Sequence, residues 1–498
     1  MTANLDTLDY FCLAAYLFGI LALGVWVGRR IKTGADYFLA GKQLPWWAIG
    51  LSLVATDIGG VDIIGVGGAA FSHGLAVANF EWIGCVPAMI VAAFLFIPHF
   101  WRTGIYTIPE FLERRFNVQV RSVLALCWLA FMACNLGVML LASGKLLAVL
   151  IHWEQTTCII VTAVLVGIYT VAGGLAAVVY TDAVQCVVMI AGCLLVVVFG
   201  VVDAGGVGPL RDQINAAEQV RRAQADQPAA TETLEHTDLV LPVDTPSPFP
   251  WPGILFGLAM VLSPAYWIGN PAIVQRAMGA RTEFEAKASY VWGALLKNLI
   301  PVIIVLPGLI AVARLPGLQD SDLAIPQLVA VLLPAGLRGV FLAAFLAALM
   351  SSIDSYLNSA ATILSQDLYR RLIHPEVSEQ RLLVIGRVTT VALLLWAILF
   401  AILLTDVSQG VYAIFQTLMA FFQGPAFAVL LGGLLWRRAT GRAAFVALLG
   451  GIATTVTLFS LNHPAVHEAF GIEPLFLIAE PYLYFSVWAF AVSISLLV

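Results

Sequence analysis

Ionisable side chains lie within long apolar segments of this 498-residue chain, where each needs a partner or an aqueous cavity. They are Asp57, Asp62, Glu81, Lys145, Asp182, Lys297 and Asp354. A carboxylate at the centre of a bilayer costs about 2.5–3.5 kcal/mol, so such residues mark sites that bind ions, solutes or each other. Neither a nucleophile–base pair nor a metal-ligand cluster accompanies them. The sequence therefore predicts reversible binding without covalent chemistry, and we do not expect an enzyme.

Four small or hydroxyl residues share one face of the segment AALMSSIDSYLNSAATILSQDLYRR. They are Ala348, Ser351, Ser352 and Ser355, at positions i, i+3, i+4 and i+7 of a helix. Their oxygens suit a hard cation such as Na⁺, and no His or Cys accompanies them. Serines also join packed helices through hydrogen bonds worth about 0.6 kcal/mol each. Taken alone, the spacing favours that packing role.

The segment LSLVATDIGGVDIIGVGGAA contains helix-breaking residues at membrane depth. Thr56, Asp57, Gly59 and Gly60 interrupt an otherwise apolar helix, and a helix broken there frees carbonyl groups that can ligate a cation. Close helix packing through glycine is the alternative. The two aspartates together with the glycines favour a break.

A second interruption occurs within residues 251–275, at Ser263-Pro264 and Gly269-Asn270-Pro271. The two interrupted segments are the second and seventh apolar spans, so they lie five apart. This placement is expected of inverted five-helix repeats that hold a substrate between two discontinuous helices.

Lys297 has apolar neighbours on both sides in GALLKNLIPVIIVLPG. Its ammonium group either extends to the membrane surface or pairs with an acid such as Glu81 across a cavity. Its distance from the end of the span favours the cavity.

Composition excludes a soluble globule. The chain is 61% hydrophobic and 11% charged, whereas soluble domains carry about a quarter charged residues. A net charge of −5 offers no basic face for nucleic acid. The seven cysteines lie in or beside apolar runs and are expected to be buried.

About 20 mainly apolar residues are needed to cross the hydrocarbon core. By this rule we predict about thirteen transmembrane helices in an all-α polytopic membrane protein. Their ranges are 8–28, 46–71, 75–98, 121–150, 157–179, 182–202, 251–275, 285–313, 327–368, 382–404, 410–436, 443–461 and 476–498.

Basic residues are distributed unevenly between the two sets of connecting loops, and cytoplasmic loops carry the excess. One set holds 18 of the 25 basic residues, including Arg276. The sequence therefore predicts an N-terminus outside and a C-terminus inside, in the plasma (cell inner) membrane.

Five regions are expected along the chain. They are an N-terminal extra helix and cytoplasmic loop (1–45), a first inverted repeat (46–202), an extracellular or periplasmic loop (203–250), a second inverted repeat (251–436) and accessory helices (437–498). Outside 203–250 the loops are short, which leaves no room for a nucleotide-binding module.

Several ordered blocks of the chain resemble the sodium/solute symporter family, in particular its sodium/sugar cotransporter branch. They are GLSLVATDIGG, GLAVANFEW, IYTIPEFLERRF, YTVAGGLAAVVYTDAVQ, GNPAIVQRAMGA and SSIDSYLNSAATILSQDLY. The resemblance covers nearly the whole length and implies a LeuT-like fold of inverted five-helix repeats.

The resemblance also implies two cation sites. The main sodium site would use backbone carbonyls of Ala55, Ile58 and Ala348 with the hydroxyls of Ser351 and Ser352. A second cation site, present in some members, would use Asp182, Ser351, Asp354 and Ser355. Asp354 stands where a Ser, Thr or Ala is expected, so this site carries an extra acid that could bind sodium or a proton.

The positions that match the family's sugar site are Asp62, Glu81, Ser263, Tyr266, Trp267, Lys297 and Gln416. Carboxylate, ammonium and amide groups can bond ring hydroxyls, and an aromatic face covers the apolar side of a sugar. Asp62, Ser263 and the neighbouring Asp57 depart from the branch pattern. Asp62 leaves room for an amino sugar or another cation.

The predicted function is sodium-coupled import of a sugar or related polyol by alternating access. Alternative cargoes on the same fold are a carboxylate, an amino acid, an amino sugar or a nucleobase, and a sensor or a solute pore is a rival of another class. The expected partners are sodium ions, the small-molecule solute and membrane lipid, with no nucleic acid and no obligatory protein partner.

Overall fold

The structure is a computed structural model that describes residues 5–28, 40–105, 107–172, 175–224, 236–245, 247–405, 410–463, 466, 475–476 and 481–498. The described residues form helices and no β-strand, as expected of an all-α membrane protein. Of the polar stretch 203–250, residues 225–235 lie outside the described part, whereas residues 207–224 form a helix.

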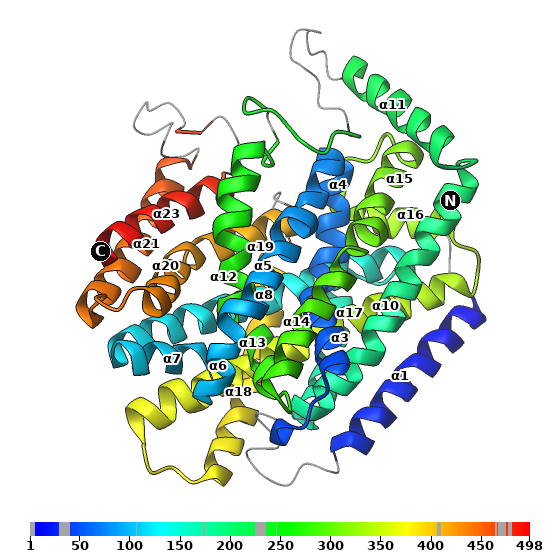
Figure 1. The fold of residues 1–498 in the computed structure, drawn as a ribbon. Helices are drawn as coiled ribbons and strands as arrows, with labels where there is room; N and C mark the ends of the chain where they lie inside the picture. The colour runs from blue at the N-terminus through cyan, green and yellow to red at the C-terminus, as the bar shows by residue number, and fades with distance from the viewer. Residues whose placement is uncertain are drawn as a thin grey trace.

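The helical elements follow one another closely along the chain (Figure 1). The first part contains α1 (Thr7–Gly28), η1 (Ala40–Lys42), α3 (Trp46–Asp57), η2 (Asp62–Val66), α4 (Gly67–His73), η3 (Gly74–Ala78), η4 (Phe80–Cys85), α5 (Val86–Val91), η5 (Ala92–Phe96), α6 (Ile97–Thr103), α7 (Ile108–Arg115), α8 (Val118–Ile151), α9 (Gln155–Ala172), α10 (Leu175–Asp203) and α11 (Val207–Gln224). The second part contains η6 (Gly253–Leu262), α12 (Ser263–Gly269), α13 (Pro271–Met278), α14 (Glu283–Lys297), η7 (Pro301–Val305), α15 (Leu306–Arg314), η8 (Ser321–Leu323), α16 (Ala324–Leu332), α17 (Leu337–Thr362), η9 (Ile363–Ile373), α18 (Glu379–Leu403), α19 (Val411–Ala420), α20 (Gln423–Leu435), α21 (Gly441–Leu461) and α23 (Tyr482–Leu497).

Eight helices of the described part are long and apolar enough to cross a membrane, and eleven are if each of three bent pairs is counted as one span. The other two predicted ranges, 157–179 and 476–498, hold the shorter apolar helices α9 and α23. The chain is therefore a multi-pass membrane protein.

Three of the spans are bent at a short break. The bends are 60° between α3 and the helix that begins at Asp62, 52° between α12 and α13, and 42° between α19 and α20. The first was predicted from its glycines together with two aspartates, and the second from Gly269-Asn270-Pro271. The interruption predicted at Ser263-Pro264 is wrong, because the helix runs unbroken from Gly253 to Gly269. Asn270 caps α13, since its Oδ1 accepts from the Ala272 N–H at 3.0 Å. The third was predicted to be continuous, as residues 410–436, and is not.

The predicted ninth span, 327–368, is two helices. The chain leaves helical geometry after α16 because Pro334 follows and Gly336 adopts a positive φ of 88°. Asp9 on α1 then caps α17, since its Oδ1 accepts the N–H groups of Gly336 at 2.7 Å and Gly339 at 2.6 Å. One carboxylate thus ties the first helix to the start of α17.

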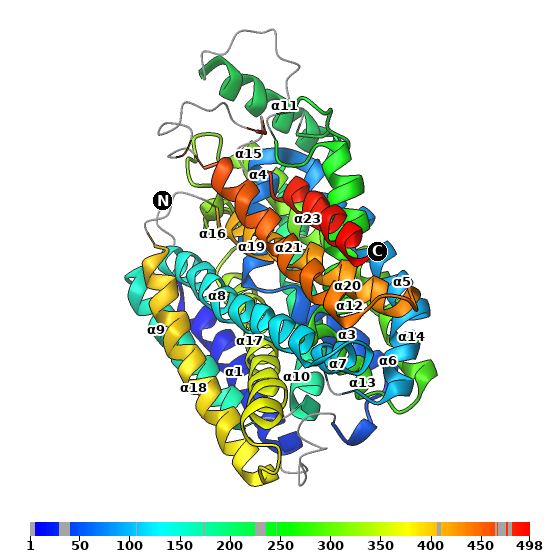
Figure 2. The same cartoon turned by 90° about the vertical axis from the view of Figure 1, so that its left-hand side faces the viewer.

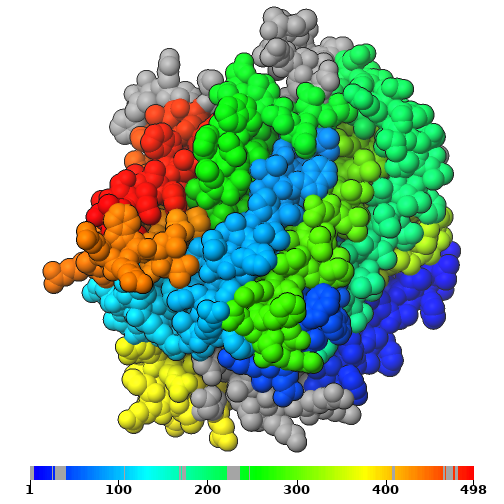
Figure 3. All heavy atoms as spheres, viewed as in Figure 1, coloured from blue at the N-terminus to red at the C-terminus, as the bar shows by residue number. Residues whose placement is uncertain are grey.

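The segment that begins with α17 is the centre of the bundle. Within its apolar stretch, 94% of the residues are buried, and α17 packs against α1, α3, α8, α10 and α18 (Figure 2). By contrast, α1 and α18 leave Phe18 78% and Leu395 64% exposed. Figure 3 shows the outer side of α1 uncovered along one edge of the molecule. Such apolar surfaces suit contact with lipid.

Candidate functional site

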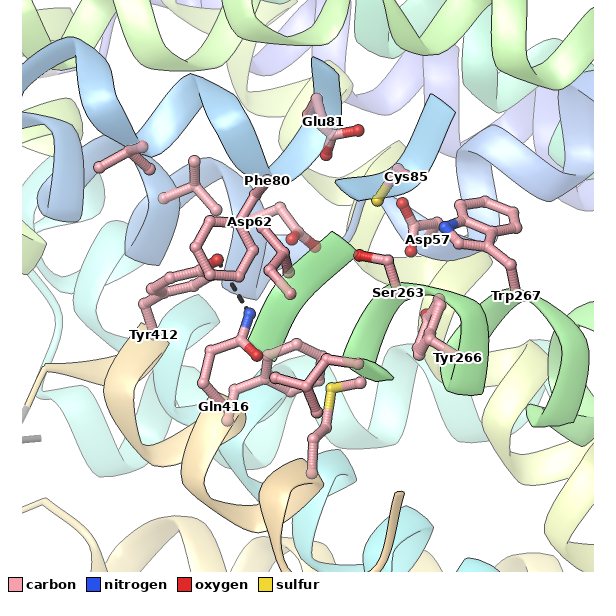
Figure 4. Close-up of a pocket in the computed structure, with 16 residues that line it drawn as sticks. Asp57, Asp62, Phe80, Glu81, Cys85, Ser263, Tyr266, Trp267, Tyr412 and Gln416 are labelled. Atoms are coloured by element: carbon pink, nitrogen blue, oxygen red, sulfur yellow. Dashed lines mark hydrogen bonds between the residues drawn. The ribbon is translucent and has the colours of Figure 1, made fainter. Parts of the chain in front are cut away.

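A cavity of about 590 Å³, including its open part, lies between the first bent span, η4, α12 and α19 (Figure 4). Its wall contains Asp57, Asp62, Val66, Val77, Phe80, Glu81, Cys85, Leu258, Leu262, Ser263, Tyr266, Trp267, Tyr412, Phe415, Gln416 and Met419. We call it the solute cavity. Its mixture of aromatic surface with a few polar groups is typical of small-molecule sites. Six of the seven predicted solute-binding residues line it.

The seventh predicted residue, Lys297, lies behind two of the carboxylates. Its fully buried ammonium group pairs with Asp57 and lies 2.6 and 2.8 Å from the two oxygens of Glu81. It also lies 5.8 Å from the centre of the Trp267 ring. The predicted pairing with Glu81 is confirmed, and Asp57 is an additional partner. Asp57, Glu81 and Cys85 could together hold a metal ion, but the ammonium group already supplies a positive charge there.

Asp62 differs from the other two carboxylates of the solute cavity because no described Lys, Arg or His pairs with it. Its Oδ2 accepts the Gly59 N–H at 2.8 Å, which caps the new helix that begins at Asp62. The same side chain therefore stabilises the break in the helix and faces the cavity (Figure 4).

Several other polar groups of the cavity have spare hydrogen-bonding capacity. Ser263 is only 5% exposed and bonds to no described residue, and the buried indole N–H of Trp267 has no partner. Gln416 donates to the Tyr412 hydroxyl at 2.8 Å, and the hydroxyls of Tyr266 and Tyr356 lie 3.1 Å apart. The cavity can thus both donate to and accept from a guest molecule.

The residues predicted to bind sodium belong to α3, to Ile58 just beyond it and to α17, which packs against α3. Ile58, just beyond α3, is extended, with φ −86° and ψ 93°. Ser352 on α17 donates to the Thr56 carbonyl at 3.0 Å. A Cβ atom placed on Gly59 would lie 2.7 Å from the Ser352 hydroxyl, so any larger residue there would displace that side chain. Ala55, Ala348 and Ser351 are buried as well.

The residues of the predicted second cation site meet around an arginine. Arg276 on α13 donates to Asp182 Oδ2 at 3.1 Å and to the Ser355 hydroxyl, and its Nε donates to Ser52 at 2.7 Å. Ser351 donates to Asp182 Oδ1 at 2.7 Å. We call these five residues the Asp182 cluster. All of them are buried, so a guanidinium group is the cation held there.

Arg276 was expected in a cytoplasmic loop, and that expectation is wrong because the side chain is 1% exposed within α13. Asp354, next to the cluster, is fully buried as well. Its Oδ1 accepts from Ser355 at 3.2 Å, and its Oδ2 has no partner.

A separate network of charges joins α7, α8 and η9. Glu113 pairs with Arg121 and, at 2.6 Å, with Arg371, while Arg121 also reaches Asp367 at 2.7 Å. Burial of Glu113 opposes its ionisation, but the two guanidinium groups outweigh burial and lower its pKa below the ordinary value. Thr107 at the start of α7 donates to Asp367 at 2.8 Å. The network fixes the short helix α7 to the bundle.

Comparisons with known proteins agree with this architecture. A profile described as the sodium:solute symporter family matches residues 37–451. The chain is 33% identical over 477 residues to a sodium/glucose cotransporter of Vibrio parahaemolyticus, covering 90% of this chain and 84% of that protein. It is 33% identical over 472 residues to sodium/myo-inositol cotransporter 2 of Mus musculus, covering 90% and 69%.

Two solved structures share the fold. A structure described as the substrate-bound outward-open state of a Na⁺-coupled sialic acid symporter matches with a TM-score of 0.80 and 21% identity, covering 99% of this chain and 96% of that chain. The nucleobase-cation-symport-1 family transporter Mhp1 matches with a TM-score of 0.52 and 12% identity, covering 93% and 95%. The predicted LeuT-like fold is therefore confirmed, whereas the predicted domain boundaries stay a prediction.

Proposed function

Because the chain belongs to the sodium:solute symporter family, we propose that it imports a sugar or related polyol together with sodium by alternating access. The observation that carries this proposal is the solute cavity, in which Glu81, Trp267 and Gln416 gather beside the break in the first bent span. Carboxylate and amide groups bond hydroxyls, and the indole ring covers the apolar face of a sugar ring.

The proposed sodium site uses the carbonyls of Ala55, Ile58 and Ala348 and the hydroxyls of Ser351 and Ser352. It is supported by the hydrogen bond from Ser352 to the Thr56 carbonyl, because this contact brings hydroxyls of α17 to the broken end of α3. Oxygen ligands of this kind suit a hard cation. Sodium bound there would join α3 to α17 and so favour one arrangement of the bundle over another.

The Asp182 cluster is proposed as the second cation site, with Asp354 as its extra acid. In the described arrangement the guanidinium group of Arg276 already supplies positive charge. A second sodium or a proton would therefore enter only when Arg276 withdraws, so that one sodium accompanies each solute while Arg276 stays in place.

The energetics of one sodium ion are sufficient for accumulation. One Na⁺ crossing about 100 mV gains about 2.3 kcal/mol, and a tenfold gradient adds about 1.4 kcal/mol. Together these support a solute concentration ratio of several hundred. No nucleotide hydrolysis is needed.

We propose the plasma (cell inner) membrane as the location, with the N-terminus outside and the C-terminus inside. The unequal distribution of basic residues between the two sets of loops supports this orientation. Lipid would contact the exposed apolar faces of α1 and α18. An obligatory protein partner is not part of the proposal.

A carboxylate cargo is the least suited alternative. Three carboxylates line the solute cavity, and its one paired ammonium group, on Lys297, already contacts two of them in the described structure. An anionic solute would meet like charges, which disfavours binding.

The test is uptake of labelled hexoses and polyols into proteoliposomes under an inward sodium gradient, with potassium in place of sodium as the control. We expect uphill accumulation that requires sodium. Equilibration without accumulation would indicate a pore, and binding without uptake would indicate a sensor. Sodium-driven uptake of a carboxylate but of no sugar would contradict the cargo assignment.

A further inference from the structure

The walls of the solute cavity carry more negative than positive charge. Asp57, Asp62 and Glu81 all line it, and Lys297 is the only basic residue of the described structure that pairs with any of them. A sodium ion at the proposed site would add one positive charge nearby. With all three carboxylates ionised, one negative charge still lacks a counter-charge.

Asp62 is the one carboxylate of the three with which no Lys, Arg or His of the described structure pairs. Asp57 and Glu81 share the ammonium group of Lys297, whereas the side chain of Asp62 bonds only to the Gly59 N–H among the described residues, at 2.8 Å. Asp62 is half-buried and lines the cavity among the apolar and aromatic side chains of Val66, Phe80 and Tyr412. An ionised carboxylate in such surroundings gains strongly from a cation that enters the cavity, because little water screens the attraction.

Two further observations indicate that this space receives a polar guest rather than an ion alone. Ser263 is 95% buried yet has no hydrogen-bond partner among the described residues, and Figure 4 shows its hydroxyl directed into the cavity. The fully buried Trp267 also lines the cavity with an unpartnered indole N–H. Buried polar groups normally have partners, so these two are available for hydroxyl groups of a solute. The cavity is also far larger than a bare ion needs.

We propose that the preferred solute is a cationic amino sugar or amino polyol, whose ammonium group binds Asp62 while its hydroxyls bond to Ser263, Trp267 and Gln416. This inference rests on the proposed function, because it concerns the solute that enters the same cavity with sodium. It names Asp62 as the residue that distinguishes amines from neutral sugars. A proton on Asp62, transported with a neutral sugar, is the competing explanation.

The experiment compares matched sugars that differ by one charged group. Sodium-driven uptake in proteoliposomes is measured at pH 6.5 for D-glucose, for its 2-amino, 3-amino and 6-amino deoxy derivatives, and for N-acetyl-D-glucosamine, which keeps the nitrogen without the charge. At least one amine should show an apparent affinity roughly 10- to 100-fold higher than glucose, as expected of a charge-assisted hydrogen bond in a shielded site. If the 2-amino derivative is the preferred amine, N-acetyl-D-glucosamine should bind no more tightly than glucose, because acetylation removes the positive charge.

The residue assignment is tested with Asp62→Asn, which keeps an amide oxygen able to accept the Gly59 N–H. We expect the ratio of amine to glucose affinity to fall at least tenfold. The matched control is Asp320→Asn, since Asp320 is a half-exposed carboxylate outside the cavity, and this variant should keep the wild-type ratio.

The possible outcomes distinguish a failure of this inference from a failure of the proposed function. Sodium-driven uptake of neutral sugars with no preference for any amine overturns the inference and leaves the proposed function in place. Uptake of a neutral sugar that acidifies the vesicle lumen has the same consequence, because it indicates that a proton enters with the sugar. Uptake of none of these solutes with sodium overturns the proposed function and the inference together. Should Asp62→Asn fail to fold, the wild-type panel decides the inference by itself.

Discussion

The solute cavity and the Asp182 cluster are both built from carboxylates and hydroxyls beside a broken helix, but they differ in how far their negative charge is balanced by a basic side chain. In the Asp182 cluster, Arg276 bonds Asp182 and Ser355, and every member is buried. In the solute cavity, Asp62 has no described cationic partner and borders about 590 Å³ of space. The Asp182 cluster thus holds one tethered cation for its one carboxylate, whereas the solute cavity holds one, on Lys297, for three carboxylates and leaves Asp62 to a mobile cation.

The largest effect is expected from Lys297→Met, which removes the tethered cation of the solute cavity. Asp57 and Glu81 would lose their shared partner, and breaking a buried ion pair costs about 3–5 kcal/mol. We expect the thermal midpoint of the purified protein to fall sharply and uptake to be abolished.

Lys287→Met is the matched control on the same helix, because Lys287 pairs with Glu283 at 2.8 Å where its side chain is 33% exposed. Such a pair contributes about 1 kcal/mol or less. Equal losses of stability in the two variants would contradict the role given to Lys297.

Arg276→Gln is expected to open the Asp182 cluster to sodium. A site that binds sodium only in the folded protein adds about 1.4 kcal/mol of stability per tenfold rise in sodium. Loss of the guanidinium group should therefore roughly double the dependence of the thermal midpoint on sodium, measured with choline as the replacement cation. In Arg102→Gln, which removes a largely exposed guanidinium group, the dependence should stay as in the wild type. An unchanged dependence in Arg276→Gln would show that the cluster takes no second sodium.

A smaller effect is expected from Ser352→Ala, which removes one proposed sodium ligand and its hydrogen bond to Thr56. The sodium concentration for half-maximal uptake should rise about tenfold, the effect of one lost interaction with a charged group. Ser365→Ala is the control, since Ser365 bonds only within its own helical segment, to Ala361 at 2.6 Å and Thr362 at 3.2 Å. Identical sodium dependence in both variants would remove Ser352 from the site.

The smallest effect is expected from Glu113→Gln. Like Asp182, Glu113 pairs with arginine, but it lies outside the membrane spans. Its lowered pKa means that the folded protein holds the proton less tightly than the unfolded chain does. The stabilisation is therefore present above the pH range in which an ordinary glutamate titrates and disappears as pH falls through the lowered pKa. Glu113→Gln should cost about 1 kcal/mol or less at pH 7, and thermal midpoints should converge with those of the wild type in acid. A gap that widens in acid would contradict this sign.

The sequence predicts those parts of the fold that depend on local chemistry. The break at Asp57–Gly60 was predictable because two aspartates accompany the glycines at membrane depth, and the break at Gly269–Pro271 because proline cannot continue a helix. The bend between α19 and α20 was not predicted, although Pro425 has no N–H to donate to the carbonyl of Phe421. Hydropathy does not register this loss, because the residues around the bend are apolar.

The site was predictable to the extent that membrane burial makes polar residues rare and therefore informative. Glu81 and Lys297 were paired correctly although 216 positions separate them. Arg276 was misplaced because hydropathy assigns arginines to loops. Its burial is compensated by distant residues, above all by the carboxylate of Asp182, 94 positions away. Which carboxylate keeps its charge unpaired depends on side-chain distances that the sequence does not contain.

Cys85 gives the solute cavity a chemical reporter of its own. It lies beside Asp57 and Glu81, and no other cysteine of the chain lines this wall. A small neutral thiol reagent that enters the cavity meets one sulfur there, and a bound solute shields it. Slower alkylation of Cys85 when a solute is present would therefore report, without any engineered residue, that the solute occupies the cavity.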